Sequence, residues 1–441
     1  MQFLFLILVL LLQLQSQAQN PPKILQLIGG GQHMCLRTSE GRIKCWGAND
    51  QGQLGLGNTD NRGDEAGEMG VNLPYVDLGS PSPVQQISAG AVHTCALLAS
   101  GQVKCWGGNN AGQLGIGDAI SHGSHAGEMG NQLPFVDLGP GVRAIQISAG
   151  FLHTCALLNT HQIKCWGFNG SGQLGLGDNS NRGDEAAEMG SNLPVVDLGA
   201  NNRAKAVSAG DLHTCALLMN DQVKCWGDNT FGALGLQDRV ARGEGRGEMG
   251  NSLPSLDFRS KKNLQSIAAF QSGNCAILDQ KEIRCWGNNA LGQLGIGNTL
   301  NQADSSDRPL SSIALVNLGE GIEVQSLVTN NMAMHSCALL KDQSVKCWGG
   351  NLSGQLGLGD TNNRGDQPGE MGDNLSRVDL GAGAKVLSLA VMSAANCALL
   401  DQGQVKCWGD NSVGQLGLGD ISNRGDESGE MGDSLPALSL F

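Results

Sequence analysis

Positive charge is scarce in this sequence. Its 28 lysines and arginines are outnumbered by 41 aspartates and glutamates, which gives a formal net charge of −13 at pH 7. Nucleic-acid binding depends on Lys and Arg side chains that neutralise phosphates. Neither a basic cluster nor a basic tail occurs along the chain. We therefore expect no nucleic-acid partner.

A hydrophobic run long enough to span a bilayer is also missing. The longest run, residues 3–12, has ten apolar residues, whereas a membrane helix needs about 20. Ten residues suit the apolar centre of a signal peptide, and Ser16 and Ala18 place small residues where a signal peptidase reads. Because no Lys or Arg precedes the run, an apolar amino-terminal strand and an uncleaved anchor are the alternatives. We expect a signal peptide over residues 1–18 and a secreted or extracellular protein, periplasmic or cell-surface in a bacterium, without a membrane span.

Catalytic motifs are absent as well. No nucleophile elbow, Walker loop, zinc-protease motif or C-x2-C metal motif occurs. Possible carboxylate pairs recur from repeat to repeat, so spacing singles out none of them. Calcium is the alternative, at the acidic residues Asp60, Asp64, Glu65 and Glu68, although no EF-hand spacing is present. We expect a non-enzymatic protein with no cofactor and no metal.

What the sequence does contain is a repeat. Seven Cys-Trp-Gly tripeptides are spaced 60 residues apart, except for one interval of 62 between the fifth and sixth. The tryptophans are Trp46, Trp106, Trp166, Trp226, Trp286, Trp348 and Trp408. Each unit has short aliphatic and β-branched segments bounded by turn residues, which is the signal of strands. In the second unit these segments are 73–78, 84–89, 93–98 and 102–106.

Four strands in each of seven units are typical of a β-propeller, whose blades pack around a channel. The sequence thus predicts an all-β fold, a seven-bladed propeller of four-stranded blades forming one domain over residues 19–441. The first unit lacks the opening "LPxVDLG" segment, and a spare copy ends the chain at 435–441. We expect this carboxy-terminal strand to complete the first blade and close the ring.

The cysteines form seven C-x9-C pairs with none left over. Each pair flanks a predicted hairpin, where opposed residues have Cα atoms roughly 4.5–5.5 Å apart, within the range of a disulfide. With a secretory signal, the spacing predicts one disulfide per blade, and reduced core thiols or a metal site are the alternatives. The predicted bonds join Cys35 to Cys45, Cys95 to Cys105, Cys155 to Cys165, Cys215 to Cys225, Cys275 to Cys285, Cys337 to Cys347 and Cys397 to Cys407.

The stretch "HTCALLASGQVKCWGGNNAGQLGIGD", residues 93–118, resembles the repeat of the regulator of chromosome condensation family. That repeat carries a His-Ser-x-Ala-Leu stretch, a Gly-x-Val turn, Trp-Gly-x-Asn and Gly-Gln-Leu-Gly. The resemblance covers every unit and implies a seven-bladed propeller. Members include a guanine-nucleotide exchange factor for a small GTPase, a plant light sensor using Gly-Trp-Arg-His-Thr motifs, and a secreted β-lactamase inhibitor. This chain has no Gly-Trp-Arg-His-Thr motif, so its tryptophans are interpreted as packing between blades.

Two recurrent features admit both a structural and a functional interpretation. Histidines stand two residues before a hairpin cysteine in five units, where they could line a metal or anion site or satisfy turn backbone groups: His33, His93, His153, His213 and His335. Glu-Met-Gly recurs in six of the long inserts between units. These inserts either build a partner-binding rim or fold over their own blade edges, with the methionine filling a gap.

Four of the inserts contain Arg-Gly-Asp, which is interpreted as a repeated turn or as an adhesion motif. The few exposed aromatic candidates are the residues that an inhibitor would use. The resulting candidate partner-binding rim is Arg62, Asp64, Tyr75, Phe135, Phe168, Arg182, Asp184, Phe231, Arg364, Asp366, Arg424 and Asp426. We expect a monomeric binding or scaffold module for an extracellular protein or glycan. The alternatives are a secreted enzyme inhibitor and a guanine-nucleotide exchange factor.

Overall fold

The computed structural model describes residues 21–258, 264–278 and 282–441. The expected signal peptide, residues 1–18, lies outside these ranges. Within them, no helix has the length and apolar character that crossing a membrane requires.

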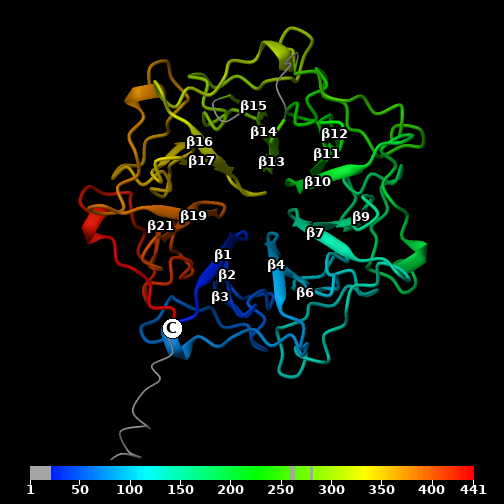
Figure 1. Ribbon diagram of the computed structural model, residues 1–441, viewed down its shortest axis with the longest axis horizontal. Coiled ribbons are helices and arrows are strands. Elements are labelled where there is room, and N and C mark those ends of the chain that lie inside the picture. Colours follow the sequence, from blue (N-terminus) through cyan, green and yellow to red (C-terminus); the bar gives the residue numbers. More distant parts are fainter. Residues whose placement is uncertain (1–20, 259–263, 279–281) are drawn as a thin grey trace, which may run out of the picture.

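Seven antiparallel sheets of three strands make up the described part of the chain and lie around a central axis (Figure 1). The inner strands are β1 (Ile24–Gly29), β4 (Val84–Ala89), β7 (Ala144–Ala149), β10 (Ala204–Ala209), β13 (Ser266–Phe270), β16 (Val324–Val328) and β19 (Val386–Val391). The middle strands are β2 (His33–Thr38), β5 (His93–Leu98), β8 (His153–Leu158), β11 (His213–Leu218), β14 (Gly273–Ile277), β17 (His335–Leu340) and β20 (Ala395–Leu400). The outer strands are β3 (Ile43–Gly47), β6 (Val103–Gly107), β9 (Ile163–Gly167), β12 (Val223–Gly227), β15 (Ile283–Gly287), β18 (Val345–Gly349) and β21 (Val405–Gly409).

The middle strands are buried on both faces because a neighbouring sheet covers each side. All six residues of β5, HTCALL, are buried. Small and aliphatic residues at these positions let adjacent sheets pack closely, and a separate hydrophobic cluster fills each of the seven spaces between sheets. The space between the first and seventh sheets is filled like the others, by residues that include Leu36, Trp46, Leu399 and Leu416.

The expected fourth strand of each blade is not a strand. Residues 73–78 form an extended segment with a single backbone bond to the sheet before it, from Val76 N to Ile43 O at 2.9 Å. Pro74 has no N–H to add to a ladder, and the Leu78 carbonyl is taken by Lys104 of the following sheet at 2.7 Å. The segment therefore bridges two sheets, and the prediction of four-stranded blades is corrected to three strands plus this bridging segment.

The carboxy-terminal copy of the segment makes the same two contacts. Leu438 N donates to Val405 O of β21 at 2.8 Å, and Lys44 Nζ in β3 donates to Leu440 O at 2.8 Å. Leu438 and Leu440 are buried with residues of both the first and seventh sheets. The expectation that this segment adds a strand to the first blade is thus replaced by a bridge between those two sheets.

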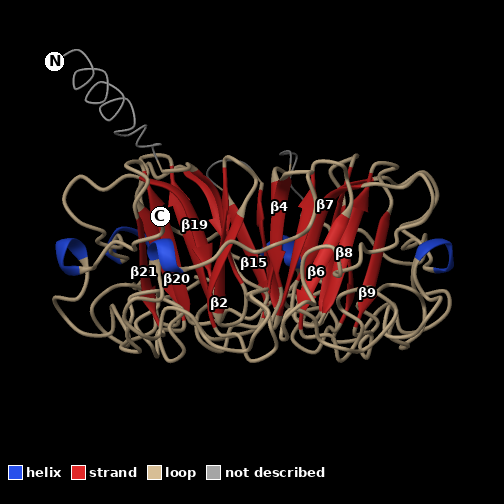
Figure 2. Cartoon of the chain, turned by 90° about the horizontal axis from the view of Figure 1, so that it is seen from below, coloured by secondary structure: helices blue, strands red, loops and turns tan. Residues whose placement is uncertain are grey.

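The two faces of the ring differ in their connections (Figure 2). One face, here called the loop face, carries the turn after each inner strand, such as 90–92, and the long connection that follows each outer strand, such as 108–118. The other, called the hairpin face, carries the short turns between middle and outer strands, such as 99–102. Short 3-10 helices lie in the inserts: η1 (Gly70–Asn72), η2 (Gly190–Asn192), η3 (Leu310–Ser312), η4 (Gly372–Asn374) and η5 (Gly432–Ser434).

The central channel is narrow and crossed by a loop. A cavity of about 290 Å³ lies between the inner strands, where Gln26, Gln86 and Gln146 each hydrogen-bond the backbone of the next sheet. Two extra residues in the sixth unit, the source of the 62-residue interval, lengthen the turn 329–334. Asn330 Nδ2 reaches Gly29 O at 2.8 Å, and Asn331 Nδ2 reaches Ala149 O at 2.9 Å. The lengthened turn therefore braces sheets on opposite sides of the channel.

Candidate partner-binding face

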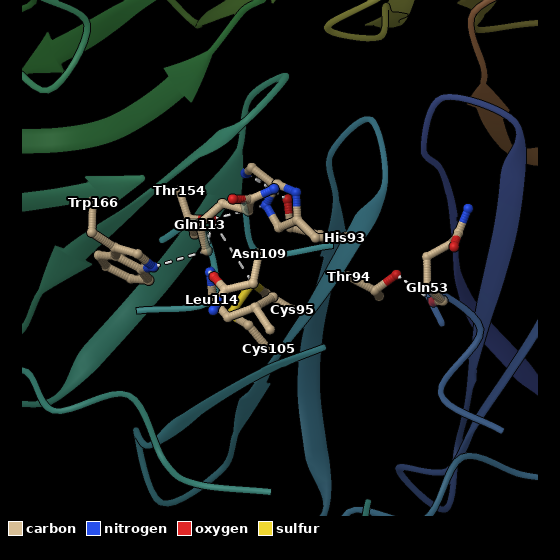
Figure 3. Close-up of a disulfide and its surroundings, with 12 residues drawn as sticks. Gln53, His93, Thr94, Cys95, Cys105, Asn109, Gln113, Leu114, Thr154 and Trp166 are labelled. Carbon is tan, nitrogen blue, oxygen red and sulfur yellow. Dashed lines mark hydrogen bonds between the residues drawn. A yellow bond between two sulfur atoms is a disulfide. The ribbon is translucent and has the colours of Figure 1, made fainter. Parts of the chain in front are cut away.

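The seven predicted disulfides are confirmed. Cys95 and Cys105 face each other in the β5–β6 register with Cα atoms 4.1 Å apart (Figure 3). The other six bonds have the same arrangement and join Cys35 to Cys45, Cys155 to Cys165, Cys215 to Cys225, Cys275 to Cys285, Cys337 to Cys347 and Cys397 to Cys407. All 14 cysteines are paired and buried, which supports the disulfide interpretation over reduced core thiols or a cysteine metal site. Seven such bonds indicate that the protein folds in an oxidising, extracellular-type environment.

Each tryptophan and histidine joins neighbouring sheets. Trp166 Nε1 and Thr154 Oγ1 both donate to Gln113 O of the preceding sheet, at 3.1 and 3.0 Å (Figure 3). His93 Nε2 lies 2.9 Å from Thr154 Oγ1. Because the threonine proton goes to Gln113, the histidine must donate from Nε2, which leaves Nδ1 unprotonated. Among the described residues that Nδ1 has no partner. The rings are therefore structural, but they bond side chains of the next sheet rather than the turn backbone groups that the sequence predicts.

Burial keeps the histidines neutral. Desolvation lowers the pKa of His93 and His153 to about 3 and of His33 and His335 to about 4, and it also lowers the pKa of His213. Each ring is fully buried between two sheets. In the described residues, no group of three or more His, Cys, Asp or Glu is arranged to hold a metal.

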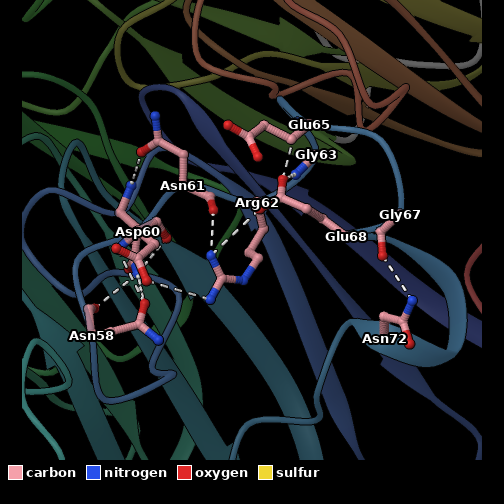
Figure 4. Close-up of polar contacts among 10 residues, drawn as sticks. Asn58, Asp60, Asn61, Arg62, Gly63, Glu65, Gly67, Glu68 and Asn72 are labelled. Atoms are coloured by element: carbon pink, nitrogen blue, oxygen red, sulfur yellow. Dashed lines mark hydrogen bonds and ion pairs between the residues drawn. The ribbon is translucent and has the colours of Figure 1, made fainter.

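The Glu-Met-Gly inserts form the framework of the outer edge. In the first insert Glu68 Oε2 accepts hydrogen bonds from Gly63 N at 2.9 Å and Glu65 N at 3.1 Å (Figure 4). Gly70, at a left-handed φ of +68° that favours glycine, presents its carbonyl to buried Lys44 Nζ at 2.7 Å. The glutamate thus holds the insert's turn, and the glycine satisfies a buried cation.

The methionine of the motif fills a space between sheets. A Cβ built on Gly55 would lie 2.7 Å from Trp106 Nε1 and 3.0 Å from Met129 Cε. The methionine methyl and the indole therefore pack directly against Gly55 and leave no room for a side chain. This explains the last glycine of the Gly-Gln-Leu-Gly motif.

The Arg-Gly-Asp tripeptides lie at the same joints. Arg182 pairs with Asp178 Oδ2 at 2.7 Å rather than with Asp184, and Gly183 O accepts a bond from Gly117 N of the preceding unit at 3.0 Å. Arg364 and Arg424 pair with Asp360 and Asp420 in the same way, and Arg62 lies near Asp60 and Glu68. Burial and the neighbouring Glu68 and Glu430 carboxyls raise the pKa of Asp64 and Asp426, and Asp366 likewise lies beside Glu370.

The four aromatic candidates are split between two places. Tyr75 and Phe135 lie on the outer edge, where the Arg42 guanidinium is 3.4 Å from the Tyr75 ring centre and Lys104 Nζ is 4.6 Å from that of Phe135. Phe168 and Phe231 lie on the loop face, in the connections that follow β9 and β12. The two outer-edge aromatics and the two loop-face aromatics therefore lie on different parts of the surface and do not form one cluster.

The turns of the loop face differ from unit to unit. At the third position of the turn after each inner strand, or its counterpart in the lengthened sixth turn, the residues are Gln32, Val92, Leu152, Leu212, Ser272, Met334 and Ala394. These residues are half-buried or exposed, whereas the buried tryptophans repeat without change. Half-buried or exposed apolar residues gather here: Val92, Phe151, Leu152, Phe168, Leu212, Phe231, Leu291, Met332, Met334, Leu352 and Val413. The rim predicted from the sequence includes two of them, Phe168 and Phe231.

A cavity of about 420 Å³, here called the mouth cavity, opens at this face over the lengthened turn. Its walls include Val92, Phe151, Leu152, Met332 and Val413, together with polar groups of the first unit. Backbone bonds join neighbouring turns around it, such as Ala91 N to Phe151 O at 3.0 Å and Phe151 N to Gly210 O at 3.3 Å. The cavity is therefore bordered by turns that are bonded to one another from the seventh unit through the first to the fifth.

Comparison with known proteins agrees with this architecture. The chain is 26% identical over 391 residues to the Ultraviolet-B receptor UVR8 of Arabidopsis thaliana, which covers 78% of this chain and 81% of that one. It is 25% identical over 340 residues to the human E3 ubiquitin-protein ligase HERC2, covering 77% of this chain but 6% of the ligase. It is thus similar to a small part of that protein.

Solved structures share the fold. Yeast RCC1 (Prp20), crystallised bound to Kap60, superimposes with a TM-score of 0.63 at 18% identity, covering 92% of this chain and 84% of that one. Human WBSCR16 gives a TM-score of 0.60 at 17% identity, covering 86% and 90%. The profile of the Regulator of chromosome condensation (RCC1) repeat matches residues 40–97, and that of the RCC1-like domain matches residues 83–430. The chain belongs to the RCC1-like domain family.

Proposed function

We propose that the protein is a secreted, disulfide-braced propeller that binds a protein partner through its loop face and performs no catalysis. In this proposal residues 1–18 are removed as a signal peptide and residues 19–441 form one monomeric domain. The apolar run at 3–12 and the seven disulfides support secretion. Membership in the RCC1-like domain family supports a binding scaffold.

The observation that carries the proposal is the set of half-buried and exposed apolar side chains in the turns and connections of the loop face, several of which line the mouth cavity. Phe231, Met334 and Leu352 are exposed by 37%, 38% and 79%, although burial would stabilise each by about 1.5–3 kcal/mol. Contiguous exposed apolar surface on a soluble protein usually marks an interaction site. Loops on a rigid scaffold can present it without a large ordering cost.

The predicted rim residues contribute unequally to this proposal. Phe168 and Phe231 lie on the loop face, and we assign them to the binding surface. The four Arg-Gly-Asp tripeptides and the outer-edge aromatics Tyr75 and Phe135 have partners within the ring. We assign them to holding the inserts in place.

Capture of a partner tests the proposal. The oxidised protein, immobilised on beads, is incubated with the extracellular medium of its source, and a retained protein is purified for binary binding measurements. Replacing Phe231 and Leu352 by Ser is expected to weaken that binding at least about tenfold. The matched control replaces Ile145 and Met219, exposed apolar residues outside the loop face, and leaves the affinity unchanged. Absence of any specifically retained protein, or equal losses in both variants, would refute the proposal.

We also propose that the carboxy-terminal segment closes the ring by bridging the seventh and first sheets. Deleting residues 435–441 removes the buried Leu435, Leu438 and Leu440 and leaves Lys44 Nζ without one of its two carbonyl partners. At about 2–3 kcal/mol for each buried leucine, the free energy of unfolding should fall by about 6 kcal/mol or more. Urea unfolding measures the loss. Deletion of Phe441 alone is the control, and a full truncation as stable as that control contradicts the proposal.

A further inference from the structure

The mouth cavity combines an apolar wall with acidic groups on both sides. Phe151, Leu152 and Val92 form part of the wall. Asp50 lines the cavity from the first unit and is exposed. Its carboxylate accepts hydrogen bonds only from uncharged amides among the described residues, Gln51 and Gln53. The charge of Asp50 therefore has no cation beside it.

A second carboxylate flanks the other side. Asp211 directly follows Gly210, whose carbonyl is bonded to Phe151 N, so it lies next to the cavity wall. No described residue donates a hydrogen bond to its carboxylate. Asp228, whose N donates to Leu212 O at 2.8 Å, adds a third negative charge nearby. Burial first, and then the charge of Asp228, raise the pKa of Asp211 to about 6.

Basic residues are missing from the turns after the inner strands and from the connections just after the outer strands around the mouth cavity. Arg62 follows the lining residue Asn61. Its guanidinium lies near Asp60 and Glu68. The turns 30–32, 90–92, 150–152, 210–212, 271–272, 329–334 and 392–394 contain no Lys, Arg or His. The same holds for the connections 48–53, 108–113, 168–173, 228–233, 288–293, 350–355 and 410–415, which include Asp50, Asp228 and Asp410. Elsewhere the inserts pair their carboxylates with arginines, as Asp178 does with Arg182. Acidic groups are thus left without a cation where the apolar cavity opens.

We propose that the mouth cavity binds a segment of another protein in which an apolar side chain is flanked by lysine or arginine. The apolar side chain enters between Phe151, Leu152 and Met332, and the flanking cations meet Asp50 on one side and Asp211 on the other. The inference rests on the proposed function and adds the chemistry of the partner. Complementary charge selects the segment and speeds its association, whereas the apolar anchor supplies most of the affinity.

Short fluorescent peptides with a central Phe or Leu between lysines or arginines test the inference by anisotropy. Two matched peptides serve as controls, one with the basic residues replaced by Glu and one with the apolar residue replaced by Ser. We expect saturable binding of the basic-apolar peptides that weakens with salt and falls at least about tenfold for either control peptide. No saturation, or equal binding of a control peptide, overturns the inference.

Variants of the protein locate the site. Asp50→Asn, Asp211→Asn and Leu152→Glu are each expected to weaken binding about tenfold. Asp401→Asn and Met219→Glu, exposed on the hairpin face, are the matched controls and bind as the wild type does. Thermal unfolding verifies that each variant is folded. If Leu152→Glu does not fold, the two aspartate variants alone test the site. Unchanged peptide binding by the aspartate variants refutes the site.

The outcome separates this inference from the proposed function. If a captured partner depends on Phe231 and Leu352 while no basic-apolar peptide binds, the binding function stands and the stated partner chemistry is wrong. If neither the partner nor the peptides bind, both fail.

Discussion

Reduction of all seven disulfides is expected to unfold the protein completely at 25 °C. Each bond closes a loop with a sequence separation of 10, which is worth about 2–3 kcal/mol in the chain-entropy description. The seven loops do not overlap in the sequence, so their effects on the unfolded chain add to about 14–21 kcal/mol. A native protein is typically stable by only about 5–15 kcal/mol.

Denaturation with and without reductant measures this effect. The oxidised protein should show a cooperative urea transition, and the reduced, alkylated protein should have none. Because the sulfurs are buried, reductant should reach them only after the ring opens, and mass spectrometry should find mostly seven intact bonds or none. A double variant, Cys155→Ala with Cys165→Ala, is the graded control, destabilised by about 2–3 kcal/mol. A fully reduced chain with a native transition would refute the prediction.

Stability is expected to fall steeply as the pH drops from about 6.5 to 4. His33, His93, His153 and His335 have a pKa of about 3 to 4 when folded, well below the ordinary value of 6.5. In this window the unfolded chain binds a proton at each histidine and the folded chain does not. Each therefore costs up to about 1.4 kcal/mol of stability per pH unit below pH 6.5, and this cost has nearly vanished by about pH 7.5. His213, whose pKa is also lowered, adds to the effect, and Asp211 with a raised pKa opposes it.

The free energy of unfolding, measured with urea between pH 8 and pH 4, gives the number of protons that the protein takes up on unfolding. His335→Ala should lower stability at pH 8 through loss of its bond to Asn396 at 2.9 Å, and should reduce the uptake by about one proton. Alanine is suited to the site because the seventh sheet carries Ala395 there. His125→Ala is the matched control, since that side chain is 80% exposed. An uptake unchanged in His335→Ala would show that the buried histidines do not set the acid limit.

The repeated core could be predicted because its interactions are local or recur at a fixed interval. Cys95 and Cys105 oppose each other across the four-residue turn 99–102, so their pairing follows from hairpin register alone. The blade number follows from the tryptophans. The prediction of a fourth strand is wrong. It arose because "LPxVDL" has the alternation of a strand, but Pro74 and the lysine of the next sheet limit the backbone pairing of this segment.

The loop face was less predictable because nothing local defines it. The two extra residues of the sixth unit are visible as a longer interval, yet Asn330 contacts Gly29, which is 301 positions away in the sequence. Phe151 and Asp50 come from different units and line one cavity only after the ring has formed. Motif-based reasoning favoured the inserts, whose Arg-Gly-Asp triplets are distinctive in sequence but are used within the ring.

The positions of Lys23 and Leu440 in the ring also determine how the molecule can be displayed. Lys23 O accepts a bond from Ser39 N in the first hairpin, so the chain enters the ring on the hairpin face, and Leu440 is held at the outer wall by Lys44. A fusion partner or surface linker joined at either point leaves the apolar, acidic opening directed toward the solvent. Copies anchored side by side would then present these openings in one common orientation.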